Sequence, residues 1–469
     1  MGQILRFEGL PRWSALTLIV GVQCVLVLLL VLDWRLPFAL VLGGLGVVAG
    51  IRWPLVAVGL VIGGRILSTG SMSWLRVGGL NIGLFEPMLF LGLTVLVAHA
   101  VVQRRAVLSS FPWRAPLLVF LAWQVLSLSW SHRLGSGIQD LVAVGVILVT
   151  STVLLAFVRS WDDFRVTALT WVGASLLLAL LSVTTDFNQV ADTGKVWEIA
   201  ARGGRETGLG QQPNWFAMNL MFSILLAFGL ALTERRWVWR LGLVAAGVLI
   251  FFAQLRSGSR GGAYSIVIGA LLVGCAKPLF RKWVLRIGVV GVALFAAGIL
   301  FGEESTRKGF MRIWLNIGNL WRSDVRARSW WVCIQMLQDT WGLGIGPGSF
   351  AALLEQYDWK LYSSVHRYPH GIFWGLMAHY GLVGIGLASW GLFAVSRMAR
   401  AFLVRVRGTP AEVFAWVMPA TLVGYVAWSF VEFNFDDKPF WEYLALFTAL
   451  CMADLPGKTE PGIELETER

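Results

Sequence analysis

Residues 138–158 read IQDLVAVGVILVTSTVLLAFV, an apolar run that contains one charged residue, Asp140. A helix needs about 20 apolar residues to cross the hydrocarbon core of a bilayer. The run is continuous, whereas a strand of a transmembrane barrel alternates between apolar and polar residues over about ten positions. This stretch therefore predicts a transmembrane helix.

Runs of the same kind recur along most of the chain. They predict about 12–14 transmembrane helices, with a range because the second and third runs are short and the last is weakly apolar. The predicted fold is an all-α, polytopic integral membrane protein with one transmembrane domain over residues 1–453. The predicted spans are 14–32, 36–51, 53–67, 83–102, 113–131, 138–158, 164–184, 214–232, 237–254, 259–276, 283–302, 371–395, 412–431 and 440–453.

The composition agrees with this fold class and argues against a soluble protein. Of the 469 residues, 57% are hydrophobic and only 14% are charged, whereas a soluble domain carries about 25% charged residues. The net charge of +12 does not indicate a nucleic-acid partner, because multispanning proteins concentrate Lys and Arg in their cytoplasmic loops. Membrane lipids are the expected surroundings.

Basic residues define the predicted orientation. They cluster near residues 104–114, 235–240, 277–286 and 397–407. When the spans are counted, all four clusters fall on the same side of the membrane as the N-terminus. That side is cytoplasmic by the positive-inside rule, so both termini are predicted to be cytoplasmic.

Two long loops, 185–213 and 303–370, are then predicted to face the outside. The second forms the large extracytoplasmic loop and holds most of the mass outside the membrane. Within it, residues 326–338 have the pattern of an amphipathic helix that lies on the membrane surface. The polar and acidic residues 454–469 are predicted to be a disordered cytoplasmic tail.

Three stretches far apart in the chain place charged or titratable residues before a predicted span. They read RETGLGQQPNW (205–215), RSGSRGG (256–262) and HRYPHGIFW (366–374). Pro213 suits the first turn of a helix, and Ser259 suits an N-cap. In the predicted topology, the three spans that follow all start on the outer side.

The residues in these stretches suit the binding of a diphosphate. Helix starts carry unpaired N–H groups and a partial positive charge, which attract phosphate. Arg205 and Arg260 would add forked donors, and Arg256 and Asn214 are further candidates. His370 could accept a proton from a hydroxyl near neutral pH.

Each of these features also has a simpler interpretation. Arg260 could be an arginine that reaches the membrane interface, and His370 could be an ordinary loop histidine. The segment GLGIGPG (342–348) resembles a phosphate loop, but no strand precedes it, so a turn is the expected structure. Asp436 and Asp437 resemble a metal-binding pair but lie in a very short loop.

Two ionisable residues lie near the predicted outer ends of neighbouring spans, Arg65 and Glu86. A charged side chain is costly inside a membrane and usually pairs with another charge. The sequence therefore predicts an ion pair between them.

The motifs, taken in order, resemble a known family. The GSRGG segment before an apolar helix resembles the SRG segment of the O-antigen ligase and polymerase superfamily, which are bacterial membrane glycosyltransferases. RETGLGQQPNWFA resembles the family's pattern of an arginine, a glycine and a Pro-Asn pair. VRARSWW (325–331) and PHGIFWGLMAHYGLVG (369–384) resemble the segments that lead into and close its large outer loop. The likeness covers residues 200–390, with Gly371 where the family usually has Asn and Trp341 where it has Pro.

The resemblance implies a fold of the GT-C type and a glycan donor on undecaprenyl diphosphate. The donor would be used at the periplasmic face of the bacterial inner membrane. By the same resemblance, His370 would be the general base on the acceptor hydroxyl, and Arg205 and Arg260 would bind the diphosphate. Arg326 would bind donor or acceptor. No metal or other cofactor is expected, and direct displacement predicts inversion at the anomeric carbon.

Three functions remain open at this point. A polymerase would transfer a growing glycan onto another lipid-linked repeat unit, and the count of fourteen spans favours it. An O-antigen ligase would transfer the glycan onto lipid A–core. A transporter of lipid-linked sugars would also have many spans and a cationic cavity, although no inverted repeat is visible.

Overall fold

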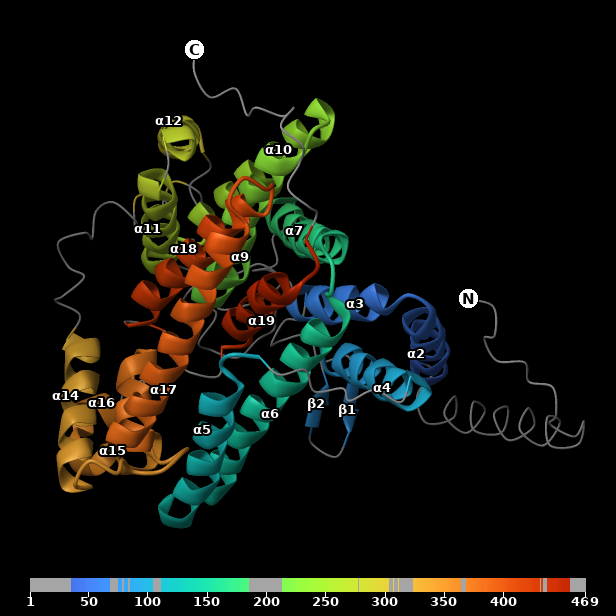
Figure 1. The fold of residues 1–469 in the computed structure, drawn as a ribbon. Helices are drawn as coiled ribbons and strands as arrows, with labels where there is room; N and C mark the ends of the chain where they lie inside the picture. Colours follow the sequence, from blue (N-terminus) through green and yellow to red (C-terminus); the bar gives the residue numbers. More distant parts are fainter. Residues whose placement is uncertain are drawn as a thin grey trace, which may run out of the picture.

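The computed structural model is helical over most of the residues that it describes. These are 35–67, 75–77, 80–82, 85–103, 111–184, 213–276, 278–302, 307, 311, 324–363, 368–430, 432 and 437–455. Figure 1 shows a bundle of long helices with a group of shorter helices, α14 to α16, gathered at one end beside α17.

The long helices fall into two sets along the chain. The first set is α2 (Arg35–Arg52), α3 (Pro54–Leu67), α4 (Phe85–Gln103), α5 (Arg114–Ser127), α6 (Leu134–Phe157) and α7 (Trp161–Thr184). The second set is α9 (Pro213–Thr233), α10 (Trp237–Arg256), α11 (Arg260–Ala276), α12 (Pro278–Leu300), α17 (Ile372–Arg405), α18 (Glu412–Ser429) and α19 (Lys438–Met452). The shorter elements are β1 (Leu75–Val77), β2 (Leu80–Ile82), the 3-10 turn η1 (Leu128–Trp130), α14 (Asp324–Asp339), α15 (Phe350–Tyr357) and α16 (Trp359–Tyr362).

Each predicted span from residue 36 onward corresponds to one of the long helices. The predicted span 14–32 and the tail after Leu455 lie outside the described residues. The antiparallel pair β1–β2 is the one departure from an all-α fold in the part described. Asp454, where the tail was predicted to begin, pairs with the chain before α7: its amide donates to the carbonyl of Arg159 at 2.9 Å.

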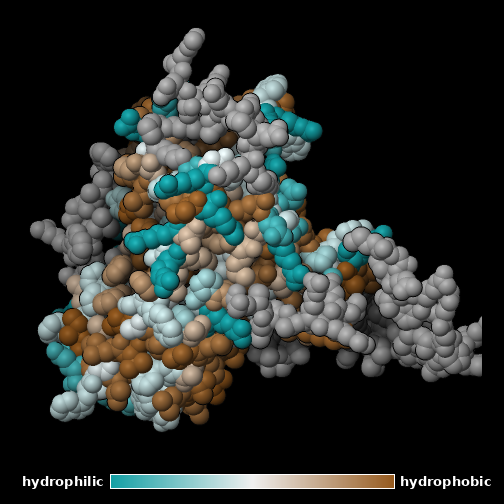
Figure 2. Space-filling model, viewed as in Figure 1, coloured by the Kyte–Doolittle hydropathy of each residue, from teal (hydrophilic) through white to brown (hydrophobic). Residues whose placement is uncertain are grey.

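Several helices are long and apolar enough to cross a membrane. Six meet this criterion by length and composition: Leu134–Phe157, Trp161–Ser182, Pro213–Thr233, Trp237–Arg256, Phe280–Leu300 and Ile372–Arg405. Large hydrophobic side chains are exposed on them, as in α6, α10 and α12, and Figure 2 shows extensive hydrophobic surface on the visible face. The chain is thus an all-α protein with the surface of a membrane protein.

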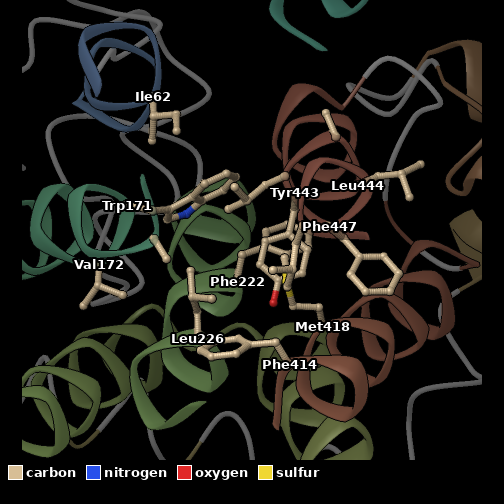
Figure 3. Close-up of a cluster of buried hydrophobic side chains, with 14 of the residues drawn as sticks. Ile62, Trp171, Val172, Phe222, Leu226, Phe414, Met418, Tyr443, Leu444 and Phe447 are labelled. Carbon is tan, nitrogen blue, oxygen red and sulfur yellow. The ribbon is translucent and has the colours of Figure 1, made fainter. Parts of the chain in front are cut away.

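The core lies around α9. Among the six helices that could cross a membrane it is the most enclosed: 89% of its most apolar stretch is buried, compared with 7% for α12. Phe222 of α9 packs against Tyr443 of α19 with ring centroids 4.8 Å apart, and Tyr443 meets Trp171 of α7 at 5.7 Å. Figure 3 shows these rings together with side chains from α3 and α18. Aromatic pairs at such distances add about 0.5–1.5 kcal/mol each beyond their burial.

Local sequence signals set several helix starts. The side chains of Ser160 and Asp163 form a reciprocal cap at the start of α7: Asp163 accepts from the Ser160 amide at 2.9 Å, and Ser160 accepts from the Asp163 amide at 3.1 Å. Pro213 is the first residue of α9, as predicted. Ser259 precedes α11, and its hydroxyl accepts from the amide of Gly262 at 3.4 Å, which confirms the predicted N-cap.

Helix α17 is longer than the predicted span 371–395 and is broken at Gly381, where φ is 65° and ψ is −157°. The segment 342–348 lies against this break. Its backbone donates from Ile345 to the carbonyl of Ala378 at 2.8 Å, and its Gly342 carbonyl accepts from Leu382 at 2.8 Å. These bonds pair a backbone carbonyl and a backbone amide that lose their helical partners at the break.

The segment 342–348 is a turn, as the sequence predicts, and the element directly before it is helix α14. Gly342, Gly344, Gly346 and Gly348 all have positive φ angles, between 70° and 83°. A Cβ at Gly344 would come within 2.6 Å of the backbone of Gly381. Glycine is therefore needed where these two backbones meet.

Candidate functional site

Helices α9, α11 and α17 begin, and α18 ends, at one end of the bundle, which we call the site end. A Cβ at Gly262, in the first turn of α11, would lie 3.1 Å from Ala217 of α9 and 3.2 Å from Trp428 of α18. At the start of α17, a Cβ on Gly371 would overlap the carbonyl oxygen of Phe430. The three helix starts that the sequence singles out are thus at the same end, as predicted.

A carboxylate that follows α18 joins three elements at the site end. Glu432 is 8% exposed. It forms an ion pair with Arg326, in the first turn of α14, and accepts a hydrogen bond of 2.6 Å from the side-chain amide of Asn214. Arg326 and Asn214, both candidates from the sequence, are therefore brought together by one acidic residue.

His370 is buried, with 3% of its surface exposed, one residue before the N-cap of α17. Its φ of 53° is in the left-handed region, which is uncommon for a residue other than glycine. Such a conformation costs about 1–3 kcal/mol and persists only where neighbouring structure imposes it.

Helix α14 supplies the structure that holds His370. The indole N–H of Trp330 donates to the His370 carbonyl at 3.1 Å, and the Ser329 hydroxyl donates to the Tyr368 carbonyl at 3.0 Å. Trp330 also stacks on Trp374 of α17, with centroids 5.2 Å apart. Two consecutive residues of α14 thus fix the backbone on both sides of Pro369.

Tyr368 connects the histidine to the Arg326–Glu432 pair. Its ring lies 4.0 Å from the imidazole of His370, centroid to centroid. Burial raises the pKa of the Tyr368 phenol; the negative charge of Glu432 raises this pKa further, and the positive charge of Arg326 lowers it. Because α14 carries Arg326 and also binds the His370 carbonyl through Trp330, the ion pair and the histidine belong to one part of the structure.

The remaining sequence candidates are placed less centrally. Arg260 is the first residue of α11 and is partly buried, and Arg256 is the last residue of α10, one turn earlier in the chain. Arg205 lies outside the described residues. The packing of α11 on α9 and α18 puts Arg260 at the site end.

The structure describes one of the two acidic residues before α19. Asp436 lies outside the described residues. The carboxylate of Asp437 accepts a hydrogen bond of 2.8 Å from the buried hydroxyl of Tyr425 in α18. This bond gives Asp437 a structural partner that joins α18 to the start of α19.

Sequence reasoning missed Glu432, Tyr368 and Trp330. Glu432 had a usable signal, because it is an ionisable residue directly beside the predicted span 412–431, and ionisable residues within membrane segments are functional candidates. Tyr368 and Trp330 had none, because aromatic residues are common throughout this chain.

The ion pair of Arg65 also differs from the prediction. Arg65 pairs with Glu442 of α19, whereas the sequence suggested Glu86. Its guanidinium also donates to Asn219 of α9 at 2.6 Å and lies 5.3 Å from the ring centroid of Trp171. This buried group links α3, α7, α9 and α19 at Asn219, five residues after Asn214 in α9.

The close contact between α11 and α18 can be tested by adding one carbon atom. A Cβ at Gly261 would overlap the indole of Trp428, so Gly261→Ala is expected to lower the free energy of unfolding by about 1–3 kcal/mol. Thermal unfolding in detergent would measure it. Gly173→Ala in α7 is the control, because its Cβ would meet no atom within 4 Å and alanine favours a helix over glycine by about 1 kcal/mol. Equal unfolding temperatures for the two variants would contradict the packing argument.

Neither a scan against models of protein families nor a search of curated proteins finds a match to this chain.

Proposed function

We propose that the chain is a metal-independent, inverting glycosyltransferase of the GT-C type, similar to the O-antigen ligase and polymerase superfamily. It would move a glycan from undecaprenyl diphosphate to an acceptor hydroxyl at the periplasmic face of the bacterial inner membrane. One observation carries the proposal: helix α14 binds the backbone of the buried His370 through Trp330 and also carries Arg326, which pairs with Glu432, the acceptor of Asn214.

The proposed reaction uses each part of this arrangement. The acceptor hydroxyl gives its proton to His370 as its oxygen attacks the anomeric carbon. The bond between that carbon and the diphosphate oxygen breaks, and the electron pair leaves with the diphosphate. Arg260 and Arg326, with Arg205, would stabilise the negative charge that develops there. Attack opposite the leaving group inverts the anomeric carbon.

Of the two transfer reactions, we propose polymerisation, in which the acceptor is another lipid-linked repeat unit. The support is the count of fourteen apolar runs predicted from the sequence, which exceeds the twelve spans common among the ligases. Ligation to lipid A–core is the alternative within the same chemistry. The acceptor would in both cases approach His370 from the region that α14 to α16 border.

A transporter of lipid-linked sugars is a second candidate, favoured by a different observation. Ionisable residues buried among membrane helices often mark a transport path, and Arg65 and Glu442 are such a pair. The aromatic packing on Trp171 and Tyr443 around the pair argues for a structural role instead.

Reconstituted vesicles separate the two functions. The purified chain is mixed with an undecaprenyl-diphosphate-linked oligosaccharide on the outer leaflet, with and without EDTA. We expect longer glycans and one released undecaprenyl diphosphate for each new glycosidic bond, and the same yield with the chelator. Movement of the labelled lipid across the bilayer without any new glycosidic bond would reject the enzyme and favour the transporter.

A further inference from the structure

Glu432 is the residue through which the separate parts of the site meet. One of its carboxylate oxygens binds Arg326 of α14, and the other accepts from Asn214 at the start of α9. The carboxylate itself follows α18 directly. Its side chain is 6% exposed, and that of Arg326 is 23% exposed, so the pair is largely shielded from solvent screening.

The arginine in this pair keeps donors for another anion. A guanidinium has five N–H donors in a planar fork, and the recorded bond to Glu432 uses a terminal nitrogen. The Nε–H of Arg326 is buried and makes no hydrogen bond within the part of the chain that the structure describes. A phosphate oxygen placed beside it would satisfy a donor that is otherwise costly to bury.

We infer that Glu432 is a positioning residue for the donor diphosphate: it fixes the guanidinium of Arg326 at the site end and ties α14 to α9 and α18. The identity of the ligand, a diphosphate, rests on the proposed function. The tie, by which we mean the contacts of Glu432 with Arg326 and Asn214, rests on geometry alone. Glu432 does not touch the reacting atoms. It acts through Arg326, and through α14 on the backbone that holds His370.

A charge argument explains why a carboxylate suits this place. An arginine buried alone would be costly to desolvate, and it would move toward solvent or another anion when no donor is bound. Glu432 balances the charge of Arg326 before a donor binds. When the diphosphate arrives, Arg326 can bind both anions along different edges of its fork, so it needs no large movement.

The chain offers a matched control on the same helix. Arg328, two residues after Arg326, binds Asp358 at the start of α16 with Nε to Oδ2 at 2.7 Å. Hydrogen bonding to Arg328 lowers the pKa of Asp358. This pair links α14 to α16. Asp358→Asn therefore removes an Arg–carboxylate pair on the same helix and leaves Glu432, Arg326 and Asn214 unchanged.

The first measurement does not depend on catalysis. Hydrogen exchange of the α14 amides is compared in the purified chain, Glu432→Gln and Asp358→Asn, each checked for an unchanged size-exclusion profile. Glutamine keeps the shape of the side chain and removes its charge. We expect Glu432→Gln to accelerate hydrogen exchange at the amides of residues 328–330 at least tenfold. The double variant Arg326→Glu/Glu432→Arg, which swaps the two charges, should restore part of the protection. Unchanged exchange in Glu432→Gln would overturn the tie.

The second measurement is the transfer reaction with the undecaprenyl-diphosphate-linked oligosaccharide. We expect Glu432→Gln to raise the KM for the donor and lower kcat/KM on the order of 10- to 100-fold, the scale expected when a binding group is displaced by about 1 Å. The KM for the acceptor should change less, and Asp358→Asn should stay near the parent. Equal effects of both variants, or an unchanged donor KM, would overturn the positioning role.

The two measurements separate the inference from the proposed function. If the parent protein forms no product but exchange rises in Glu432→Gln, the glycosyltransferase proposal fails and only the tie survives. If the parent is active and exchange rises without a change in donor KM, the positioning role fails alone.

Discussion

Replacing His370 by asparagine is expected to lower the rate of glycan transfer by about 10²–10⁴-fold, the usual contribution of a general base. Asparagine is the informative substitution here because it tolerates the left-handed backbone conformation that His370 adopts, with φ of 53°. Its amide cannot take the proton of the acceptor. The variant therefore removes the base and leaves the backbone geometry in place.

The comparison with alanine separates chemistry from strain. His370→Ala should be equally inactive, and it should also unfold at a lower temperature, because alanine is disfavoured at this φ and the cavity beside Tyr368 would be empty. Product formation is followed with the lipid-linked oligosaccharide, and stability by thermal unfolding in the same detergent. Full transfer activity in His370→Asn would show that the imidazole is not the base.

His132 provides the control for this experiment. It follows η1, and its recorded bond is from its backbone amide to the Ser349 hydroxyl at 2.9 Å. Its imidazole has no recorded bond to α14 or to the start of α17. His132→Asn should keep transfer within about twofold of the parent protein, since a side chain outside the site changes stability only slightly.

The positions of the long helices could be predicted from sequence because the signal is local. An apolar run of sufficient length predicts a span wherever the rest of the chain lies. From residue 36 onward the long helices follow the predicted runs. Because successive spans cross in opposite directions, the sequence places the starts of α9, α11 and α17 at one end, where the structure also has them. The helix at 326–338 was found for the same reason, from its own periodicity.

The features that the sequence did not predict depend on contacts between distant segments. The break at Gly381 is held by the turn at 342–348, and no pattern within α17 indicates it. The partner of Arg65 is Glu442, near the other end of the chain, while the nearer Glu86 was the expected choice. Glu432 joins α9, α14 and α18 only once all three are packed. One sequence cannot supply such pairings.

The pair of Arg65 and Glu442 is expected to have the largest effect on stability. Arg65→Ala would leave the buried carboxylate of Glu442 without its cation, and breaking a buried pair in this way costs about 3–5 kcal/mol. Arg65→Lys should also destabilise the protein, because an ammonium lacks the planar fork that reaches Glu442 and Asn219 together. Thermal unfolding in detergent measures both variants.

An ion pair near the surface serves as the comparison. Arg165 of α7 binds Glu234 at 2.8 Å, with side-chain exposures of 34% and 17%, and such pairs contribute about 0–1 kcal/mol. Arg165→Ala should therefore lower stability far less than Arg65→Ala. Replacing both Arg65 and Glu442 by Met and Leu should recover much of the loss, because no charge then remains buried. A double variant as unstable as Arg65→Ala would mean that the contacts of Arg65 with Asn219 and Trp171 hold α3 in place, and that the charge pair does not.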